Sequence, residues 1–329
     1  MNNMTYPLNF LESEYLSNVE SPTIKNGLIK TYKYLLSHNN IAVSVSGGAD
    51  SDDMIDVVEN IKKYFPEEWK EKSTIRYVWF DTGIEMEATK RHLNFLESKY
   101  LINIERIRSM ITVPAAVLKA GYPFISKDVS QKINNLQTSG FGFEDDTLEE
   151  LEKKYSKCKT GLTWWTGNRG SYSISRSLKK YMIDNPPDFH ISDFCCHYAK
   201  KEPSRKFILD NNIDLMLIGV RQAEGGIRST IGSCFVEKGK SKVCDQHYPL
   251  FWWTDEDKRL YEQIFNIKHS DAYEVYGFKR TGCAGCPFNS KYKDDLQILE
   301  QYEPRLANAV KNIFRKSYEY TEGYKSRGE

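Results

Sequence analysis

The sequence has no excess of charge of either sign. It contains 46 lysine and arginine residues against 45 aspartate and glutamate residues, for a formal net charge of +1. A strong field of the kind that marks nucleic-acid or membrane-surface binders is therefore excluded for the chain as a whole, although a local basic patch is compatible with this balance. Internal repeats and low-complexity tracts are missing too.

Long apolar runs are also missing. No stretch of about 18 consecutive apolar residues occurs, which excludes a transmembrane helix. The opening MNNMTYPLNFLESEYL carries acidic residues early and lacks the basic-then-apolar layout of a secretory signal. We therefore expect a cytoplasmic protein without a membrane partner. In that compartment the seven cysteines favour metal-binding or catalytic roles over a disulfide framework.

What the sequence does contain is an alternation of strand and helix patterns. Hydrophobic residues make up 40% of the 329 positions, which is enough for a buried core. Strands are expected at 41–45, 74–80, 102–107 and 213–220, and helices at 23–37, 52–64, 87–99 and from Pro114 onward. This order predicts an α/β fold with a doubly wound, mostly parallel sheet and helices on both faces.

Two segments depart from the alternation. Residues 136–192 are polar, contain clustered Gly, Ser and Lys, and are expected to form an inserted, lid-like segment outside the sheet. Residues 281–329 begin with cysteine and glycine and are expected to form a C-terminal, cysteine-containing region with a charged helical tail. Residues 24–135 and 193–280 would then form the nucleotide-binding core.

The first expected strand ends in SGGADS and leads into a helix. Gly47 and Gly48 allow positive φ and a close approach of a ligand, so that successive N–H groups form a nest for anions. The helix adds its positive N-terminal end. Ser46 and Ser51 can donate hydroxyl hydrogen bonds to phosphate, whereas Asp50 is expected to hold Mg²⁺ or to fix the loop. A plain strand-to-helix turn with Ser and Asp capping is the structural alternative.

SGGxDS resembles the pyrophosphate loop (PP-loop) of the adenine-nucleotide α-hydrolase superfamily, whose members cleave ATP between the α and β phosphates. A Walker A loop is excluded because its GK[ST] ending is missing. Asp81, Thr82 and Gly83 follow the second expected strand and resemble the DTG motif of the phosphoadenosine-phosphosulfate (PAPS) reductase family. They are second candidates for the nucleotide site, because open α/β sheets bind ligands at the carboxyl ends of their strands. An Asx turn that closes the strand is the alternative.

Two further segments carry the resemblance. IGVRQAEGGIRS resembles the family's G-x-R segment with a second arginine, so that Arg221 and Arg228 would clamp phosphate or sulfate. Solvent-facing loop arginines are the alternative. PLFWWTDEDKRLYEQI resembles a helix entry of the family, with Thr254 as the expected N-cap and Asp257 three residues later, and we assign it a structural role. The resemblance covers about residues 24–290, apart from 136–192.

Four cysteines form a separate pattern. Cys195 and Cys196 lie in tandem, and Cys283 and Cys286 follow far downstream in TGCAGCPF. In cluster-bearing members of the family such a pattern binds a [4Fe–4S] centre, so the resemblance implies these four residues as ligands. Tetrahedral Zn²⁺ is an alternative, as is a merely structural, buried cysteine. Cys244 would be a spare ligand or a sulfur carrier.

Two reactions compete within the resemblance. Sulfonucleotide (APS or PAPS) reductases carry a nucleophilic cysteine in a C-terminal Glu-Cys-Gly motif, but this sequence has no cysteine after Cys286. The intact loop favours an ATP-dependent adenylating enzyme, an ATP pyrophosphatase that activates an acceptor for sulfur insertion with an iron–sulfur cluster. Asp50, Asp81, Arg221 and Arg228 are its expected catalytic residues. A non-catalytic nucleotide-binding subunit of a larger assembly is the third hypothesis.

The resemblance to tRNA-thiolation and DNA-phosphorothioation enzymes implies ATP, Mg²⁺ and a [4Fe–4S] cluster, with zinc as the alternative metal. The expected sulfur donor is a cysteine desulfurase or a similar protein, and the acceptor a nucleic acid (tRNA or DNA) or a small molecule. A homo-oligomer or multi-subunit assembly is expected. A stacking and phosphate-binding patch in residues 136–192 and a packed lid are equal alternatives for these side chains: Trp164, Trp165, Arg169, Tyr172, Arg176, Lys179 and Lys180.

Overall fold

The structure, a computed structural model of the chain, describes residues 8–168, 170–239 and 242–327. Its residues divide into two compact units. The sheet unit comprises the described residues of Met1–Asp81, Glu85–Ile107 and Pro203–Gly282. The helical unit comprises those of Thr82–Ile84, Arg108–Glu202 and Cys283–Glu329. The three-part division that the sequence suggests stays a prediction.

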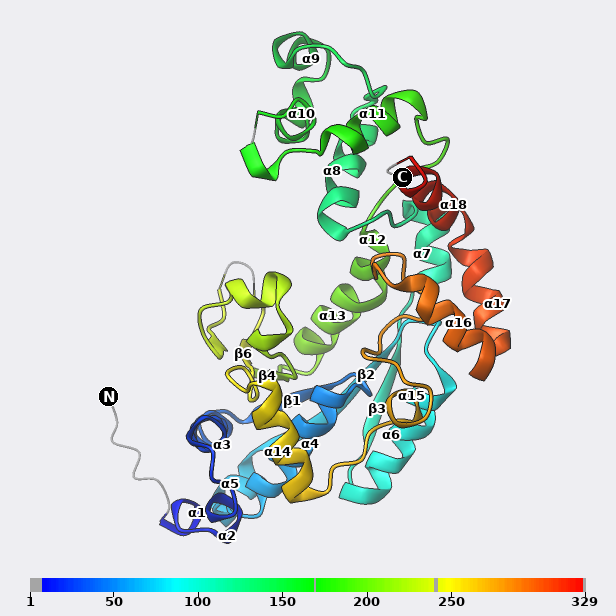
Figure 1. The fold of residues 1–329 in the computed structure, drawn as a ribbon. Coiled ribbons are helices and arrows are strands. Elements are labelled where there is room, and N and C mark those ends of the chain that lie inside the picture. Colours follow the sequence, from blue (N-terminus) through cyan, green and yellow to red (C-terminus); the bar gives the residue numbers. More distant parts are fainter. Residues whose placement is uncertain (1–7, 169, 240–241, 328–329) are drawn as a thin grey trace. The chain divides into compact units, whose positions relative to one another are not determined.

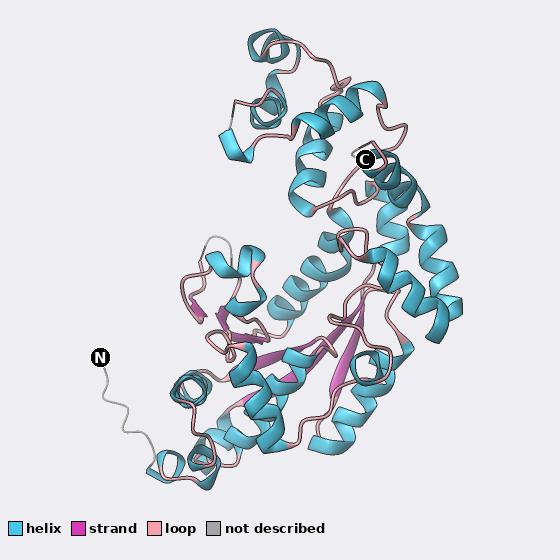
Figure 2. Cartoon of the chain, viewed as in Figure 1, coloured by secondary structure: helices cyan, strands magenta, loops and turns pink. Residues whose placement is uncertain are grey.

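A six-stranded sheet with the order β3-β2-β1-β4-β6-β5 runs through the sheet unit (Figure 2). Its strands are β1 (Asn40–Val45), β2 (Thr74–Asp81), β3 (Ile104–Arg108), β4 (Leu215–Ile218), β5 (Phe235–Val236) and β6 (Asp245–His247). β1 pairs in parallel with β2 and β4, and β4 pairs in parallel with β6. Only the β5–β6 pair, among those with a described register, is antiparallel. The predicted mostly parallel sheet is confirmed.

Successive residues of a strand face opposite sides of a sheet, and both sides are covered here. Ile41 and Val43 of β1 point into the larger core together with residues of four helices. These are α3 (Pro22–Leu36), α4 (Ala49–Lys62), α6 (Glu87–Tyr100) and α14 (Asp255–Phe265). Ala42 and Met216 face the other side, where they pack with α13 (Glu202–Asp210) (Figure 1). The predicted doubly wound arrangement, with helices on both faces, is therefore confirmed.

Local signals explain where several of these helices begin. Ser21 accepts a hydrogen bond from the N–H of Ile24, and Pro22 occupies the first turn of α3. At α14 the predicted cap is confirmed, because Thr254 and Asp257 form a reciprocal capping box. Short helices complete the unit: α1 (Leu8–Leu11), α2 (Glu14–Ser17), α5 (Glu67–Lys72) and α15 (Asp271–Glu274).

Two predicted boundaries differ from the structure. The helix expected from residue 52 begins at Ala49, because Gly48 has an extended backbone (φ −100°, ψ 158°) and takes the N-cap position. Asp50 and Ser51 are thereby residues of the first helical turn. The strand expected at 213–220 pairs only over Leu215–Ile218, since the chain turns where the N–H of Val220 bonds to the carbonyl of Ile218.

The helical unit packs around its own aromatic core. Its longer helices are α7 (Val113–Ala120), α8 (Lys127–Thr138), α9 (Leu148–Lys154), α10 (Lys159–Trp165), α11 (Arg176–Asp184), α16 (Tyr292–Tyr302), α17 (Pro304–Ile313) and α18 (Arg315–Lys325). Phe124, Leu136 and Trp165 are buried at its centre, where Tyr320 of α18 also packs. In the part of the chain that the structure describes, no helix has the length and apolar character needed to cross a membrane.

The two tryptophans of this unit are core residues. Trp164 and Trp165 are 2% and 0% exposed, and the Trp165 indole N–H donates to the carbonyl of Glu144 at 2.8 Å. The hypothesis that these two rings stack on nucleobases is therefore wrong, since packing occupies their faces. Three other side chains of the predicted patch are exposed: Tyr172, Arg176 and Lys180. Lys179 pairs with Asp145, and Arg169 lies outside the described residues.

Candidate functional site

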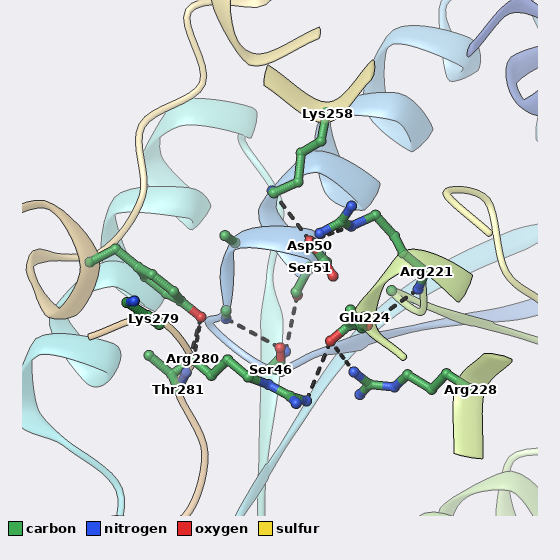
Figure 3. Close-up of a pocket in the computed structure, with 14 residues that line it drawn as sticks. Ser46, Asp50, Ser51, Arg221, Glu224, Arg228, Lys258, Lys279, Arg280 and Thr281 are labelled. Carbon is green, nitrogen blue, oxygen red and sulfur yellow. Dashed lines mark hydrogen bonds and ion pairs between the residues drawn. The ribbon is translucent and has the colours of Figure 1, made fainter. Parts of the chain in front are cut away.

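A cavity of about 250 Å³ lies in the sheet unit beside the loop between β1 and α4 (Figure 3). The loop and first helical turn contribute Ser46, Gly48, Ala49, Asp50 and Ser51. The other lining residues are Gly219, Arg221, Glu224, Arg228, Lys258, Tyr273, Lys279, Arg280 and Thr281. Five of the fourteen are lysine or arginine and only two are acidic, so the cavity suits a strongly anionic ligand.

The loop is closed by its own serine hydroxyls. Ser51 Oγ accepts a hydrogen bond from the N–H of Ser46 at 3.0 Å, and Ser46 Oγ accepts one from the N–H of Gly48 at 3.2 Å. Both hydroxyls act as acceptors in these bonds, so their hydrogens can be donated to a phosphate. The 14-residue helix α4 starts here without a side-chain cap, and its positive end adds to the attraction for an anion.

Glycines are required where the loop meets its neighbours. Gly47 has φ +67°, and a Cβ there would lie 2.6 Å from Thr89 Cγ2. A Cβ on Gly48 would lie 3.0 Å from Thr281 Oγ1 and 3.1 Å from the Tyr273 hydroxyl. These two oxygens are 2.9 Å apart, so Tyr273 and Thr281 form a polar wall against the loop. Gly47 itself packs behind the cavity rather than lining it.

Asp50 is held by two cations. Its Oδ1 lies 3.1 Å from Arg221 Nε and 3.3 Å from Lys258 Nζ. Arg221 also donates to Asp255 at 2.8 Å. Burial by itself lowers the pKa of Arg221, but the carboxylates of Asp50 and Asp255 raise it above its usual value. These contacts agree with a loop-fixing role for Asp50, whereas its binding of Mg²⁺ stays a prediction.

A second carboxylate gathers further arginines at the cavity. Glu224 Oε1 pairs with Arg228 and lies 3.3 Å from Arg280 Nη2, and Glu224 Oε2 accepts from the backbone N–H of Arg221 at 3.3 Å. The structure thus brings Arg221 and Arg228 to one cavity, as the sequence analysis expected. Arg228 is a cavity residue and not a solvent-facing loop arginine, and its side chain is only 30% exposed.

The three DTG residues are divided between the units. Asp81 ends β2 in the sheet unit and is not among the described residues that line the cavity. Thr82 and Gly83 belong to the helical unit. Thr82 accepts hydrogen bonds there from the N–H of Val113 at 2.8 Å and, through its hydroxyl oxygen, from the thiol of Cys283 at 3.6 Å. Thr82 is therefore a neighbour of the cysteine pattern.

The four predicted cysteine ligands lie in the helical unit. Cys195 and Cys196 end α12 (Phe194–Cys196), which continues into the π-helical turn His197–Lys201. Such turns are frequent at functional sites. Gly285, between Cys283 and Cys286, has φ +60°, and a Cβ there would lie 2.8 Å from the Tyr318 hydroxyl. The tight CxxC turn therefore requires glycine at this position.

The four thiols influence one another's ionisation. A hydrogen bond with Cys196, burial and the three neighbouring thiols raise the pKa of Cys195. Burial together with Cys283 and Cys196 raises the pKa of Cys286 to about 12. The hydrogen bond from Cys195, helped by Lys127 and Lys200, lowers the pKa of Cys196 to about 6 despite its burial. A bound metal is what ionises such a set completely, so the donors fit a metal centre.

The spacing of the sulfurs bears on which metal fits. Among the described residues, no three cysteine sulfurs lie within 4.8 Å of one another. A tetrahedral zinc site with bonds of about 2.3 Å would bring all four sulfurs to about 3.8 Å from one another. In a [4Fe–4S] cluster each cysteine binds a different iron, which holds the ligands further apart. No preformed tetrahedral zinc site is therefore present among the described cysteines.

The remaining cysteines are not placed for this chemistry. Cys244 is 1% exposed in the core against α13, and burial raises its pKa to about 11. Both features argue against the predicted role as a sulfur carrier, because a carrier needs an accessible thiolate. Cys244 belongs to the sheet unit and is not one of the four thiols of the helical unit. Cys158 and Cys234 are buried in apolar clusters.

Several cavity residues were not identified from the sequence. Lys258 lies on the helix to which only a structural role was assigned. Glu224 lies between the two predicted arginines. The others follow α14 in sequence: Tyr273, Lys279, Arg280 and Thr281. For Lys279, Arg280 and Thr281, the available signal in the sequence was that KRT directly precedes the GCAGC turn.

Two comparisons with known sequences match parts of this chain. The family model "Phosphoadenosine phosphosulfate reductase domain" matches residues 174–289. An adenosine 5'-phosphosulfate reductase of Neisseria meningitidis is 28% identical over 103 residues, which are 31% of this chain. The matched segment spans 40% of that relative's own length.

Two solved structures are similar to the chain at low sequence identity. The PAPS reductase of Candida auris, in a phosphate complex, has a TM-score of 0.43 and 13% identity, and covers 80% of this chain and 89% of its own. The U34-tRNA thiolase NcsA of Methanococcus maripaludis, with its [4Fe–4S] cluster, has a TM-score of 0.40 and 15% identity, and covers 92% and 78%. The family model covers less than half of this chain, and what it shows is that residues 174–289 are similar to the phosphoadenosine phosphosulfate reductase domain.

Proposed function

We propose that the chain is an ATP-dependent adenylating enzyme, an ATP pyrophosphatase that activates an acceptor for sulfur insertion and binds a [4Fe–4S] cluster. One observation carries the proposal: the serine–glycine loop, the first turn of α4 and five lysine or arginine side chains line one cavity.

The cavity suits a triphosphate better than a single phosphate. Ser46 and Ser51 supply hydroxyls, α4 supplies its positive end, and the arginines and lysines are spread around the wall. Adenylation places an acceptor oxygen on the α-phosphorus while the α–β bond breaks, and the leaving pyrophosphate carries the charge that these cations would stabilise. Mg²⁺ would enter with the nucleotide and share that charge.

Sulfur insertion would follow at the activated carbon. Sulfide forms the new bond to carbon, and AMP leaves with the acceptor oxygen, so the exchange needs no oxidant or reductant. Cys195, Cys196, Cys283 and Cys286 would hold the cluster, which would supply a site for the sulfur atom. A cysteine desulfurase is the proposed source of sulfur. Its persulfide sulfur would be released as sulfide by two electrons from a thiol reductant, which is oxidised to a disulfide. The proposed acceptor is tRNA, DNA or a small molecule.

Reduction of a sulfonucleotide is the second candidate. The family model and the similar Neisseria protein favour it, because both are named for reductases. An intact serine–glycine loop favours ATP instead, since adenosine 5'-phosphosulfate has no β,γ-pyrophosphate for the loop to hold. A nucleotide-binding subunit without activity would bind ATP and release no pyrophosphate.

The test starts from protein purified without oxygen. About four irons and four sulfides per chain, with a visible absorption band, are expected for the cluster. Equilibrium binding should then rank Mg-ATP above adenosine 5'-phosphosulfate. Pyrophosphate release is measured with tRNA, DNA and oxygen-containing small-molecule acceptors, with Ser46→Ala/Ser51→Ala as the variant that should lose it.

Each alternative has its own result. Preference for the sulfonucleotide, with sulfite as product, would replace the proposal by reduction. A colourless protein that contains zinc would remove the iron–sulfur part and leave the ATP site. ATP binding without pyrophosphate release in the presence of any acceptor would favour the non-catalytic subunit.

A further inference from the structure

A buried ionic network lies directly behind the nucleotide loop. Asp52 and Asp53, near the start of α4, are 1% and 0% exposed. His269 bridges Asp52 and Glu262, with its Nδ1 2.9 Å from Asp52 Oδ2 and its Nε2 2.8 Å from Glu262 Oε1. Lys258 bonds to Asp53 and lies 2.6 Å from Glu262. Burying so many charges is costly, and apolar residues would fill the space more stably.

Lys258 connects this network to the cavity. Its side chain is 14% exposed, and Figure 3 shows it extending to Asp50 at the cavity wall. Its ammonium has three N–H donors. Two of them are directed to Asp53 and Glu262, while the contact to Asp50 is longer, at 3.3 Å. This third, weakest contact is the one that a phosphate oxygen can most easily replace.

The network does not suit a metal ion, although three of its side chains have the right spacing. One ligand atom each of Asp53, Glu262 and His269 lies within 4.8 Å of the other two. Lys258 already binds the two carboxylates. Hydrogen bonds to Asp52 and Glu262 raise the pKa of His269 to about 10 although burial lowers it, so its ring is protonated and repels a cation. The lysine takes the place that a metal would occupy.

We propose that Lys258 is a substrate contact that binds the β- and γ-phosphates of the nucleotide and the leaving pyrophosphate. Asp53 and Glu262 hold its ammonium at the wall of the cavity, and Asp50 aims it at the loop. Arg221 is less suited to this task, because its guanidinium is already committed to Asp50 and Asp255. This inference rests on the proposed function, since it needs a nucleoside triphosphate in the cavity.

The network also explains why the lysine stays charged in a largely buried place. Burial alone would lower the pKa of Lys258, but Asp53, Asp50 and Glu262 raise it above its usual value. One oxygen each of Asp52 and Asp53 is buried without a hydrogen-bond partner among the described residues. A purely structural ion network would be expected to satisfy these oxygens.

Equilibrium binding of three probes tests the proposal: Mg-ATP, Mg-pyrophosphate and AMP. Lys258→Met keeps the length of the side chain and removes its charge. We expect it to weaken Mg-ATP and Mg-pyrophosphate binding by about tenfold or more, while AMP affinity changes by less than about twofold. Lys268→Met is the matched control, because Lys268 is an exposed lysine of the same segment, and it should leave all three affinities unchanged.

A second variant tests whether a loss of binding comes from the unpaired Asp53 rather than from the missing lysine. Lys258→Met leaves Asp53 without its cation, so Asp53→Asn/Lys258→Met removes both charges and keeps the Glu262–His269 pair. The double variant should show the same selective loss of pyrophosphate affinity. Unchanged Mg-ATP and Mg-pyrophosphate affinities in either folded variant would overturn the proposal, as would an equal loss for all three probes. If the wild-type protein binds no ATP, the proposed function fails first and this inference with it.

Discussion

In the sheet unit, each of the two carboxylates that line the cavity is paired with cations, whereas in the helical unit two of the four cysteine thiols have a raised pKa, which disfavours their charged form. Asp50 forms ion pairs with Arg221 and Lys258, and Glu224 forms ion pairs with Arg228 and Arg280. Lys127 and Lys200 lower the pKa of Cys196, but the pKa values of Cys195 and Cys286 are raised.

This difference indicates that the cavity and the cysteine group depend on their ligands in different ways. The cavity is preorganised, because its side chains are already held in position by ion pairs and need only exchange a contact for a phosphate oxygen. The cysteine group needs a positively charged centre before all four thiols can ionise. Substitutions should therefore act separately: those in the helical unit on metal content, and those in the sheet unit on nucleotide binding and on the stability of the ion pairs.

The largest expected effect is the loss of the metal centre. Cys283→Ser/Cys286→Ser removes two of the four proposed ligands, so the iron content of anaerobically purified protein should fall to background. Mg-ATP affinity should stay within about twofold of the wild-type value, because the cavity keeps its cations. Cys158→Ser is the control, since Cys158 is a buried cysteine of the same unit outside this group. Full iron content in the double variant would show that the ligands lie elsewhere.

Next in size is the removal of a buried cation. Arg221→Met leaves Asp50 with Lys258 as its one remaining described cation, and breaking a buried pair in this way costs about 3–5 kcal/mol of unfolding free energy. Urea denaturation measures it. Asp255→Asn is the comparison, because the Asp255 carboxylate is 86% exposed and its loss should cost less than about 1 kcal/mol. Equal losses would mean that burial does not distinguish the two ion pairs.

A steric change in the loop should weaken nucleotide binding in the sheet unit and leave the metal content of the helical unit unchanged. Gly48→Val would place its Cβ 3.0 Å from Thr281 Oγ1 and 3.2 Å from Ser46 Oγ, with two methyl groups beyond it. Mg-ATP binding should weaken by about 100-fold, or about 2.7 kcal/mol, and iron content should not change. Gly232→Val is the control, because a Cβ at Gly232 meets nothing within 4 Å. Iron loss in the Gly48 variant would contradict the separation.

Much of the fold could be predicted because its signals are local. Alternation in IAVSV, the two glycines of SGGADS and the Thr254–Asp257 capping box each depend on a few adjacent residues. The helix start at Ala49 was missed because Gly48 serves as an N-cap through its backbone, so the Asp and Ser residues that normally mark a helix start lie inside the first turn.

The sequence pointed to cavity residues in the SGGADS loop and, through the family resemblance, to Arg221 and Arg228. Lys258 and Arg280 reach the cavity from segments that are remote from the loop, and folding alone brings them there. A further signal was overlooked: Asp52, Asp53 and Asp56 lie among the apolar residues of the helix expected at 52–64. Buried acids need partners, and Tyr100, Lys258 and Tyr261 supply them. The tryptophans were ambiguous because exposed and buried aromatic residues look alike in sequence.

The smallest expected effect is a pH dependence of stability that originates in the network behind the loop. The pKa of His269 rises from 6.5 to about 10 on folding, so its contribution is complete below pH 6.5 and is lost as the pH rises through 10. Burial raises the pKa of Asp53 from 3.8 to about 7, so folding favours its protonated form and stability falls between those values. These two pH ranges barely overlap, so a change of stability in each range can be attributed to one of the two residues.

His269→Gln should therefore lower the unfolding free energy by about 2 kcal/mol at pH 6, the size of a hydrogen bond to a charged group, and by progressively less as the pH approaches 10. Urea denaturation at a series of pH values measures the difference from the wild type. Asp53→Asn should instead remove the pH dependence below about pH 7 and leave the upper window in place. A wild-type profile that is flat from pH 7 to 10, or an effect of His269→Gln that grows with pH, would show that His269 is not held as a cation. Lys258 would then be held by Asp53, Glu262 and Asp50 without a contribution from a charged His269.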